Sequence, residues 1–482
     1  MVDIRAALFV IGILMLVLGA AMAAVGLIDY AASGSEGSVF LISAFLTCFV
    51  GAMLFLTNRT LITSMTARTI MFMISCAWLI LPAFAALPFM FGSLNLNLTN
   101  AYFESVSGMT TTGATILSNM DQLPVGILLW RSLLQWLGGV GVVVMAISAL
   151  PALRVGGMQI FRMEFSDRLD KAMPRAAQLG VSIMTCYLLL TSLCMILYYF
   201  AGMSFFDAVN HAMTTVATGG YSTHDASFLH FDSLAIDLIA IIFMIAGSLP
   251  FLHYIQAANG NSKIFWQDSQ VRWFAVILLF AIILIAFWLT KHQNIGFWAA
   301  LRESGFNVVS FMTGTGFARD DVAQWGSFAL PVLFVLMFIG GCAGSTTCGM
   351  KIFRFQVLAY SAKAQMLKML QPHSVIVIYY NKRPLPDGVA ESVMGFFFFY
   401  VMTFGALAIG FGATGLDFLS ATSGAVTALA NVGPGLSAEI GPSGNFDGLT
   451  MAAKWMMCIG MILGRLELFT LLVLILPKFW RD

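Results

Sequence analysis

The sequence predicts an all-α polytopic membrane protein, and three observations lead to this fold class. Of the 482 residues, 59% are hydrophobic and 10% are charged. A soluble domain carries about 25% charged residues, so this composition cannot cover a water-facing surface. Apolar stretches long enough to cross a bilayer recur along the chain, and a short glycine-bearing pattern recurs between them.

Ten apolar stretches reach this length, and we expect each to be a helix because lipid offers no partner for free backbone groups. They lie near residues 6–29, 38–57, 69–92, 127–150, 178–201, 234–257, 271–290, 327–350, 389–411 and 452–477. The first stretch also resembles a signal peptide, with Arg5 before an apolar run and Ala21-Met22-Ala23 as a candidate cleavage site. The run continues to Ile28, so we predict an uncleaved first span.

Four shorter runs lie between the later spans, at residues 101–110, 206–216, 297–312 and 418–430, and each ends in a copy of one pattern. The copies are Thr110-Thr111-Thr112-Gly113-Ala114, Val216-Ala217-Thr218-Gly219-Gly220, Thr313-Gly314-Thr315-Gly316-Phe317 and Asn431-Val432-Gly433-Pro434-Gly435, with Gly113, Gly219, Gly316 and Gly433 as reference glycines. These runs are too short to cross a bilayer, so we expect half-helices that re-enter one face. The repeat unit is then helix, half-helix, irregular segment and helix.

This repeat unit divides the chain into five parts. Residues 1–65 form an N-terminal transmembrane hairpin, and residues 66–175, 176–265, 266–385 and 386–482 form four helix–pore-loop–helix repeats around one pore. The second helix of the third repeat is interrupted by a glycine-rich stretch.

Charge gives the orientation. Most of the 24 Lys and Arg residues lie on the side that holds both termini, which the positive-inside rule makes cytoplasmic. The opposite side, from which the four irregular segments enter, carries acidic residues such as Asp121, Asp225 and Asp320. A negative mouth raises the local concentration of cations, although ordinary solvated loops would give the same bias.

The four glycine-bearing segments have the features of an ion filter. Glycine permits backbone angles that aim successive carbonyls inward, and rings of carbonyls can replace the water shell of a cation. The alternative is that Thr and Gly are only helix-packing positions, as is common in membrane bundles. Four copies at matched positions favour the filter.

Two features suggest a gate. Residues Gly340–Gly349 interrupt the eighth span with glycines and small polar residues, which weaken a helix. A tightly packed helix of small residues is the alternative. Arg465 lies deep in the tenth span, where a cation is costly and marks a functional site or a structural ion pair. Arg131 and Lys454 lie nearer the outer surface, where we expect them to reach the interface or to pair with acids such as Glu104.

With these motifs the chain resembles the Trk/Ktr/HKT superfamily of potassium transporters, and most closely its bacterial Trk-type membrane subunits. The resemblance covers essentially the full length. Beyond the four segments it rests on Trp130-Arg131-Ser132-Leu133-Leu134-Gln135-Trp136, Val155-Gly156-Gly157-Met158-Gln159, Gly340-Gly341-Cys342-Ala343-Gly344-Ser345-Thr346-Thr347 and Gly464-Arg465-Leu466-Glu467.

The resemblance implies K⁺ as the transported ion, because a glycine in each filter segment accompanies potassium selectivity in this family. The carbonyl donors it implies are those of Thr111, Thr112, Gly113, Ala217, Thr218, Gly219, Gly314, Thr315, Gly316, Asn431, Val432 and Gly433. The implied gate consists of Gly340, Gly341, Gly344, Ser345, Thr346, Thr347 and Gly349 in an intramembrane loop, with Arg465 projecting into the pore. The fourth copy lacks the threonine before its glycine, which leaves its side-chain support open.

The resemblance also implies partners and a location. It implies a homodimer in the bacterial inner membrane that docks a cytosolic, nucleotide-binding ring of the TrkA type. The basic stretch 351–383 and the loop 154–175 are candidate docking surfaces, although topology-determining loops would look the same.

Other classes fit less well. There is no dense basic stripe for a nucleic acid and no HExxH, Walker A or GxSxG motif for an enzyme, and we expect no organic cofactor. The seven cysteines lie in or beside apolar stretches without a CxxC pair, so we expect free thiols. A K⁺ symporter coupled to H⁺ or Na⁺ stays open as the alternative to a gated pore.

Overall fold

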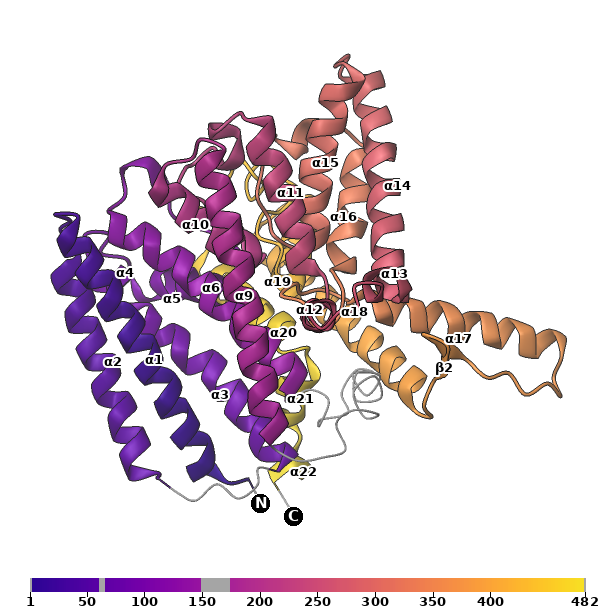
Figure 1. Ribbon diagram of the computed structural model, residues 1–482, viewed down its shortest axis with the longest axis horizontal. Helices are drawn as coiled ribbons and strands as arrows, with labels where there is room; N and C mark the ends of the chain where they lie inside the picture. Colours follow the sequence, from indigo (N-terminus) through magenta and orange to yellow (C-terminus); the bar gives the residue numbers. More distant parts are fainter. Residues whose placement is uncertain (1, 60–65, 149–173, 481–482) are drawn as a thin grey trace.

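The computed structural model describes residues 2–59, 66–148 and 174–480, which are mostly helical (Figure 1). The motif Val155-Gly156-Gly157-Met158-Gln159 and residues 149–173 of the predicted cytoplasmic loop lie outside these ranges. The first two helices, α1 (Ile4–Ala31) and α2 (Gly37–Thr57), lie side by side at one edge of the molecule. They approach closely because a Cβ atom added to Gly12 would lie 2.8 Å from the carbonyl oxygen of Gly51.

The first two repeats contain eight α-helices among the described residues. These are α3 (Ala67–Ala85), α4 (Leu87–Phe91), α5 (Leu98–Met109), α6 (Val125–Ser148), α9 (Pro174–Phe200), α10 (Phe205–Val216), α11 (Leu234–Ser248) and α12 (Phe251–Ala258). Short 3₁₀ turns, η1 (Met120–Gln122) and η2 (Ser227–His230), follow the first two irregular segments.

The third and fourth repeats are also mostly helical. They comprise α13 (Ile264–Gln267), α14 (Ser269–His292), α15 (Phe297–Thr313), η3 (Val322–Trp325), α16 (Ala329–Ile339), α17 (Ile352–Leu370), α18 (Val389–Ala413), α19 (Phe418–Ala430), α20 (Met451–Arg465), α21 (Phe469–Ile475) and α22 (Pro477–Trp480). One two-stranded antiparallel ribbon pairs β1 (Tyr379–Tyr380) with β2 (Arg383–Pro384). Beside it, α17 projects away from the bundle (Figure 1).

Seven of the described helices are long and apolar enough to cross a membrane, or nine if each of two bent pairs is one span. The chain is therefore a multi-pass membrane protein. Large apolar side chains such as Phe45, Phe200 and Ile409 are exposed on the outside of the bundle, as lipid-facing side chains are.

Three predicted spans differ from straight helices. The stretch 234–257 bends by 94° between α11 and α12, where Pro250 cannot continue the helix. The stretch 452–477 bends by 112° between α20 and α21, where Glu467 and Leu468 have positive φ. In the stretch 327–350, α16 ends at Ile339 because Gly340 has a φ of +67°.

The two ends of the described chain lie together. The backbone N–H of Asp3 donates to the Thr69 hydroxyl (3.0 Å), and the Trp480 ring packs against that of Phe72, both at the start of α3. All seven cysteines are free, which confirms the expectation from their placement.

Candidate functional site

Four irregular segments follow the short helices α5, α10, α15 and α19, and they share one backbone conformation. Each contains two residues with positive φ that are separated by one other residue. The pairs are Thr111 and Gly113, Thr218 and Gly220, Gly314 and Gly316, and Asn431 and Gly433. The residue between them donates its backbone N–H to a carbonyl at the end of the short helix: Thr112 to Ser107, Gly219 to Thr214, Thr315 to Ser310 and Val432 to Thr427, at 2.9–3.2 Å. The segments are therefore equivalent residue by residue.

This equivalence shifts the second segment by one residue relative to the sequence pattern. Gly220, rather than Gly219, occupies the position of Gly113, and Gly219 corresponds to Thr112. Ala217 then lies one residue before the matching triplet. The two adjacent glycines fit either register in the sequence, and only the backbone angles distinguish them.

The four segments form a closed ring, because a glycine of each one faces a carbonyl of the next. A Cβ atom added to any of these glycines would lie within 3.0 Å of that carbonyl oxygen. The glycine–carbonyl pairs are Gly113 with Gly219, Gly220 with Thr315, Gly316 with Val432 and Gly433 with Thr112. The contacts thus run from segment one to two, to three, to four and back to one. Glycine is required at these positions both for the contact and for the positive φ.

Hydrogen bonds between buried side chains support the ring. The hydroxyls of Thr110 and Thr112 lie 2.7 Å apart, and those of Thr313 and Thr315 lie 2.8 Å apart. In the fourth segment the Asn431 side chain supplies the support that the missing threonine left open. Its amide donates to the Thr112 hydroxyl (2.8 Å) and to the Met461 carbonyl of α20 (3.0 Å), so it joins segments four and one.

Gln135 of α6 is a functional candidate that the sequence reasoning missed. Its amide nitrogen donates to the Gly219 carbonyl (2.6 Å), and its oxygen accepts the Tyr221 N–H (3.1 Å). The signal was present in the sequence, because a glutamine at the centre of a predicted span needs a polar partner.

A buried ion pair joins the first two segments on their outer side. Arg131 Nε lies 2.8 Å from Glu104 Oε1, which is the second of the two alternatives expected for Arg131. Arg131 also donates to the Thr115 hydroxyl (3.1 Å) and the Ser222 carbonyl (3.2 Å). The Tyr221 hydroxyl donates to the Glu104 carbonyl (3.0 Å). Both charges are fully paired, so the pair positions the segments.

A cavity of about 430 Å³ lies directly against the ring. Its lining includes Gly113, Gly220, Gly316 and Pro434, one residue from each segment, together with His224 and Asp225 from the loop after the second. The cavity therefore gives access to all four segments at once; we refer to it as the mouth.

The predicted gate residues lie together in a buried, non-helical loop, Gly340–Gly349, between α16 and α17. Gly340, Gly344 and Gly349 have φ values of +67°, +77° and +75°, which explains why the helix does not continue. The Thr346 hydroxyl donates to the Gly247 carbonyl (2.9 Å) and accepts a hydrogen bond from the Thr218 hydroxyl (3.1 Å). The loop is thus bonded directly to the second segment.

Within the loop, small polar side chains satisfy one another. The Ser345 hydroxyl lies 2.8 Å from that of Thr347, and Thr347 accepts the Gly341 N–H (3.2 Å). The Lys351 ammonium, just beyond the loop, donates to the Thr347 carbonyl. These bonds maintain a compact loop without helical hydrogen bonds.

Arg465, in the last turn of α20, reaches this loop. One guanidinium nitrogen donates to the Thr346 carbonyl (3.2 Å) and lies 2.6 Å from the Cys348 sulfur, and another donates to the Gly138 carbonyl of α6 (3.0 Å). Arg465 is only 2% exposed, and no carboxylate in the described part of the chain pairs with it. Nearby Glu467 pairs with Arg354 of α17 instead, at 2.5 Å.

Comparisons with known proteins agree on one family. The TrkH family profile, described as a cation transport protein, matches residues 36–481. The chain is 46% identical over 407 residues to the Trk system potassium uptake protein TrkI of Halomonas elongata, which covers 84% of this chain and 82% of TrkI. It is 38% identical to Escherichia coli K12 TrkH, with 99% of both chains covered. The crystal structure of the potassium transporter TrkH from Vibrio parahaemolyticus superposes with a TM-score of 0.92 at 34% identity, covering 99% of this chain and 100% of that one.

Proposed function

The chain belongs to the TrkH family of cation transport proteins, and from this premise we propose that it is the membrane subunit of a K⁺ uptake system. The observation that carries the proposal is the closed ring of four glycine-bearing segments below the mouth. Backbone carbonyls from four sides can replace the water shell of a K⁺ ion.

The proposed ion ligands are the carbonyls of the three matching residues in each segment. They are Thr111, Thr112 and Gly113; Thr218, Gly219 and Gly220; Gly314, Thr315 and Gly316; and Asn431, Val432 and Gly433. Ala217 leaves the predicted set because its position matches Thr110. The Gly219 carbonyl keeps one lone pair for an ion, since the other accepts the Gln135 amide.

The proposed topology has ten spans. The seven long helices and two bent pairs give nine, and α16 with the Gly340–Gly349 loop forms the tenth, which ends before α17. The hairpin 1–65 then precedes four repeats at 66–175, 176–265, 266–385 and 386–482, with both termini in the cytoplasm of a bacterial cell. The asymmetry of Lys and Arg between the two faces supports this orientation.

In the proposed mechanism K⁺ enters the mouth, loses water to the carbonyls and then meets the Gly340–Gly349 loop. Arg465 holds that loop through the Thr346 carbonyl and adds a positive charge on the ion path. The inside-negative potential drives entry with about 2.3 kcal/mol per charge per 100 mV. Opening requires the loop to leave Thr218 and Arg465.

The proposed regulation acts from the cytoplasmic side. The relatives are named as proteins of a Trk system. We therefore propose that this chain forms a homodimer and binds a cytosolic, nucleotide-binding ring of the TrkA type. The projecting α17 (Figure 1) and the strand pair that follows it supply the docking surface. The exposed apolar residues Met369, Leu370 and Val375 lie close in sequence to basic residues there. Displacing α17 would pull directly on the loop that precedes it.

The filter is tested by adding a Cβ atom to the ring. In Gly316→Ala the methyl group overlaps the Val432 carbonyl, whereas in Gly412→Ala, on α18, nothing lies within 4 Å. We expect purified Gly316→Ala in liposomes to lose K⁺ flux or K⁺ preference over Na⁺, and Gly412→Ala to behave as the wild type. A monodisperse Gly316→Ala protein with unchanged flux and unchanged ion preference would overturn the filter.

A further inference from the structure

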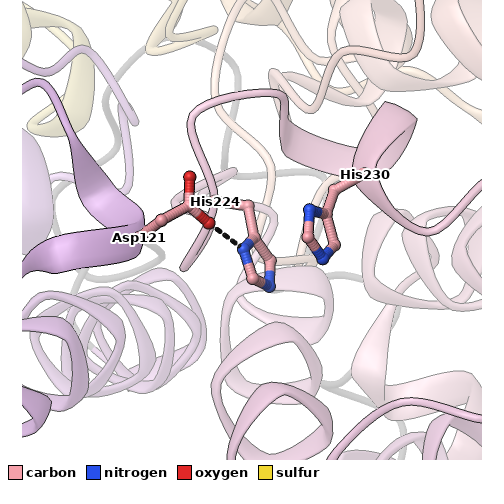
Figure 2. A group of neighbouring side chains, drawn as sticks. All are labelled: Asp121, His224 and His230. Carbon is pink, nitrogen blue, oxygen red and sulfur yellow. Dashed lines mark hydrogen bonds and ion pairs between the residues drawn. The ribbon is translucent and has the colours of Figure 1, made fainter.

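A group of three metal-binding side chains lies at the rim of the mouth (Figure 2). Asp121 belongs to η1, after the first segment, whereas His224 and His230 lie after the second, on opposite sides of a tight turn into η2. One nitrogen or oxygen from each of the three falls within 4.8 Å of the others. The family function described above makes no use of these side chains.

The three side chains are already held close together. His224 Nδ1 is hydrogen-bonded to the Asp121 carboxylate, and the His224 and His230 rings stack with centroids 3.5 Å apart (Figure 2). His224 Nε2 is buried without a hydrogen bond, 3.4 Å from Asp207 Oδ1. Asp207 is itself fixed by the hydroxyls of Ser204 (2.6 Å) and Thr223 (2.7 Å). Asp207 can therefore orient the ring through Nε2 and leave Nδ1 for a metal, as carboxylates do for histidines that bind metals.

The arrangement of these side chains favours a divalent cation. Two imidazolium rings stacked at 3.5 Å would repel each other, so at least one ring keeps a free lone pair. His224 Nδ1 faces the Asp121 carboxylate, and His224 Nε2 faces that of Asp207 on the other side of the ring. A cation between His224 Nδ1 and Asp121 would bind both groups, and the N–H at Nε2 would then point at Asp207.

From this geometry we propose that Asp121, His224 and His230 bind a transition-metal ion of the Zn²⁺ class at the outer mouth, and that the bound ion lowers K⁺ entry. Two imidazoles and a carboxylate are a ligand set of Zn²⁺ sites, whereas Ca²⁺ and Mg²⁺ prefer oxygen ligands. The exposed His230 ring turns out of the stack to direct a nitrogen at the ion, and solvent completes the coordination.

The effect on flux rests on the proposed function. His224 lines the mouth together with Gly113, Gly220 and Gly316, so a bound ion adds positive charge beside the entry of the filter. It also ties the loop of the first repeat to that of the second. Both consequences oppose cation entry, and neither is needed for binding itself.

Binding is measured first, with the full-length protein in detergent, its affinity tag removed, titrated with Zn²⁺ in a calorimeter. We expect one Zn²⁺ per chain, and at least about tenfold weaker binding in His224→Gln and in His230→Gln, because even changes outside the ligand shell cost 10–100-fold in affinity. His292→Gln is the matched control, an exposed histidine that stacks on Trp288. Absence of saturable binding, or equal binding in all four proteins, would overturn the site.

Flux is measured second, with external Zn²⁺ added to liposomes that contain each protein. We expect Zn²⁺ to slow K⁺ uptake by the wild type and by His292→Gln and to leave His230→Gln unaffected. Binding without any effect on flux would overturn the inhibitory role. If neither the wild type nor a variant with residues 343–347 deleted carries K⁺, the proposed function fails, and the titration still decides the metal site.

Discussion

Replacing Arg465 with alanine should open the proposed gate. The guanidinium group bonds the Thr346 carbonyl on the loop and the Gly138 carbonyl on α6, so it ties the loop to the surrounding helices. Arg465→Ala removes both bonds and the positive charge. Only the bond to Thr346 must break when the loop moves, so only that bond counts towards the gating equilibrium.

The size of the effect follows from that one bond. A hydrogen bond from a charged donor contributes about 1.5–3 kcal/mol. Its loss would favour the open loop by roughly 10- to 150-fold, at about 1.4 kcal/mol per factor of ten. The charge on Arg465 also repels K⁺, so its removal acts in the same direction. Arg465→Gln, which keeps amide donors without the charge, should fall between the wild type and Arg465→Ala.

The assay is Rb⁺ uptake into liposomes driven by an imposed potential, without any cytosolic partner. Lys454→Ala is the control, because Lys454 is a buried cation on the same helix that bonds Asn100 (2.9 Å) far from the loop. We expect faster uptake for Arg465→Ala and no increase for Lys454→Ala. Uptake by Arg465→Ala at or below the wild-type rate would refute the role of Arg465 in holding the gate.

Three further predictions concern other parts of the chain. Gly113→Ser places a Cβ atom against the Gly219 carbonyl. It should lower the preference for K⁺ over Na⁺ in competitive flux by about tenfold, equivalent to about 1.4 kcal/mol. An unchanged ratio of K⁺ to Na⁺ flux would remove Gly113 from the filter. Arg354→Met leaves Glu467 buried and unpaired and should cost roughly 3–5 kcal/mol of stability. We expect a lower unfolding temperature, which the double variant Arg354→Met with Glu467→Gln partly restores. Equal unfolding temperatures for the wild type and Arg354→Met would contradict this. Asp417 caps α19, and hydrogen bonds from Ser420 lower its pKa. The charged cap therefore stabilises the folded protein fully at a pH above the ordinary pKa of a carboxyl group. This stability is lost as the pH falls through the lowered pKa of Asp417. Asp417→Ala should therefore cost about 1 kcal/mol at neutral pH and less in acid, and a pH-independent difference in unfolding temperature would exclude a charged cap.

Hydrophobicity alone predicts where helices lie but not where they bend. The short runs near 206–216 and 418–430 are the helices α10 and α19, because each is apolar and bounded by residues that cap or end a helix. The bend before Pro250 had a local signal, since the residue before a proline avoids helical angles. The bend at Leu468 had none, because tertiary contacts such as the Arg354–Glu467 pair fix its backbone.

The candidate site was predictable in kind but not in register. Four glycine-bearing copies were enough to identify the segments, and the Arg131–Glu104 pair was one of two alternatives expected for Arg131. The adjacent Gly219 and Gly220 gave no local reason to choose between two alignments. Asn431 and Gln135 act through residues that are remote in sequence, so their roles appear only when α6 and α20 pack against the ring.

Ion selectivity of the open pore tests the central claim most directly. Deleting residues 343–347 removes half of the loop and leaves the four segments intact. The flux of this variant is compared for K⁺, Rb⁺ and Na⁺ in liposomes under an imposed inside-negative potential. We predict potential-driven uptake of K⁺ and Rb⁺ well ahead of Na⁺, faster than in the wild type. A folded variant that carries no cation, or carries K⁺ and Na⁺ equally, would contradict a carbonyl filter in this chain.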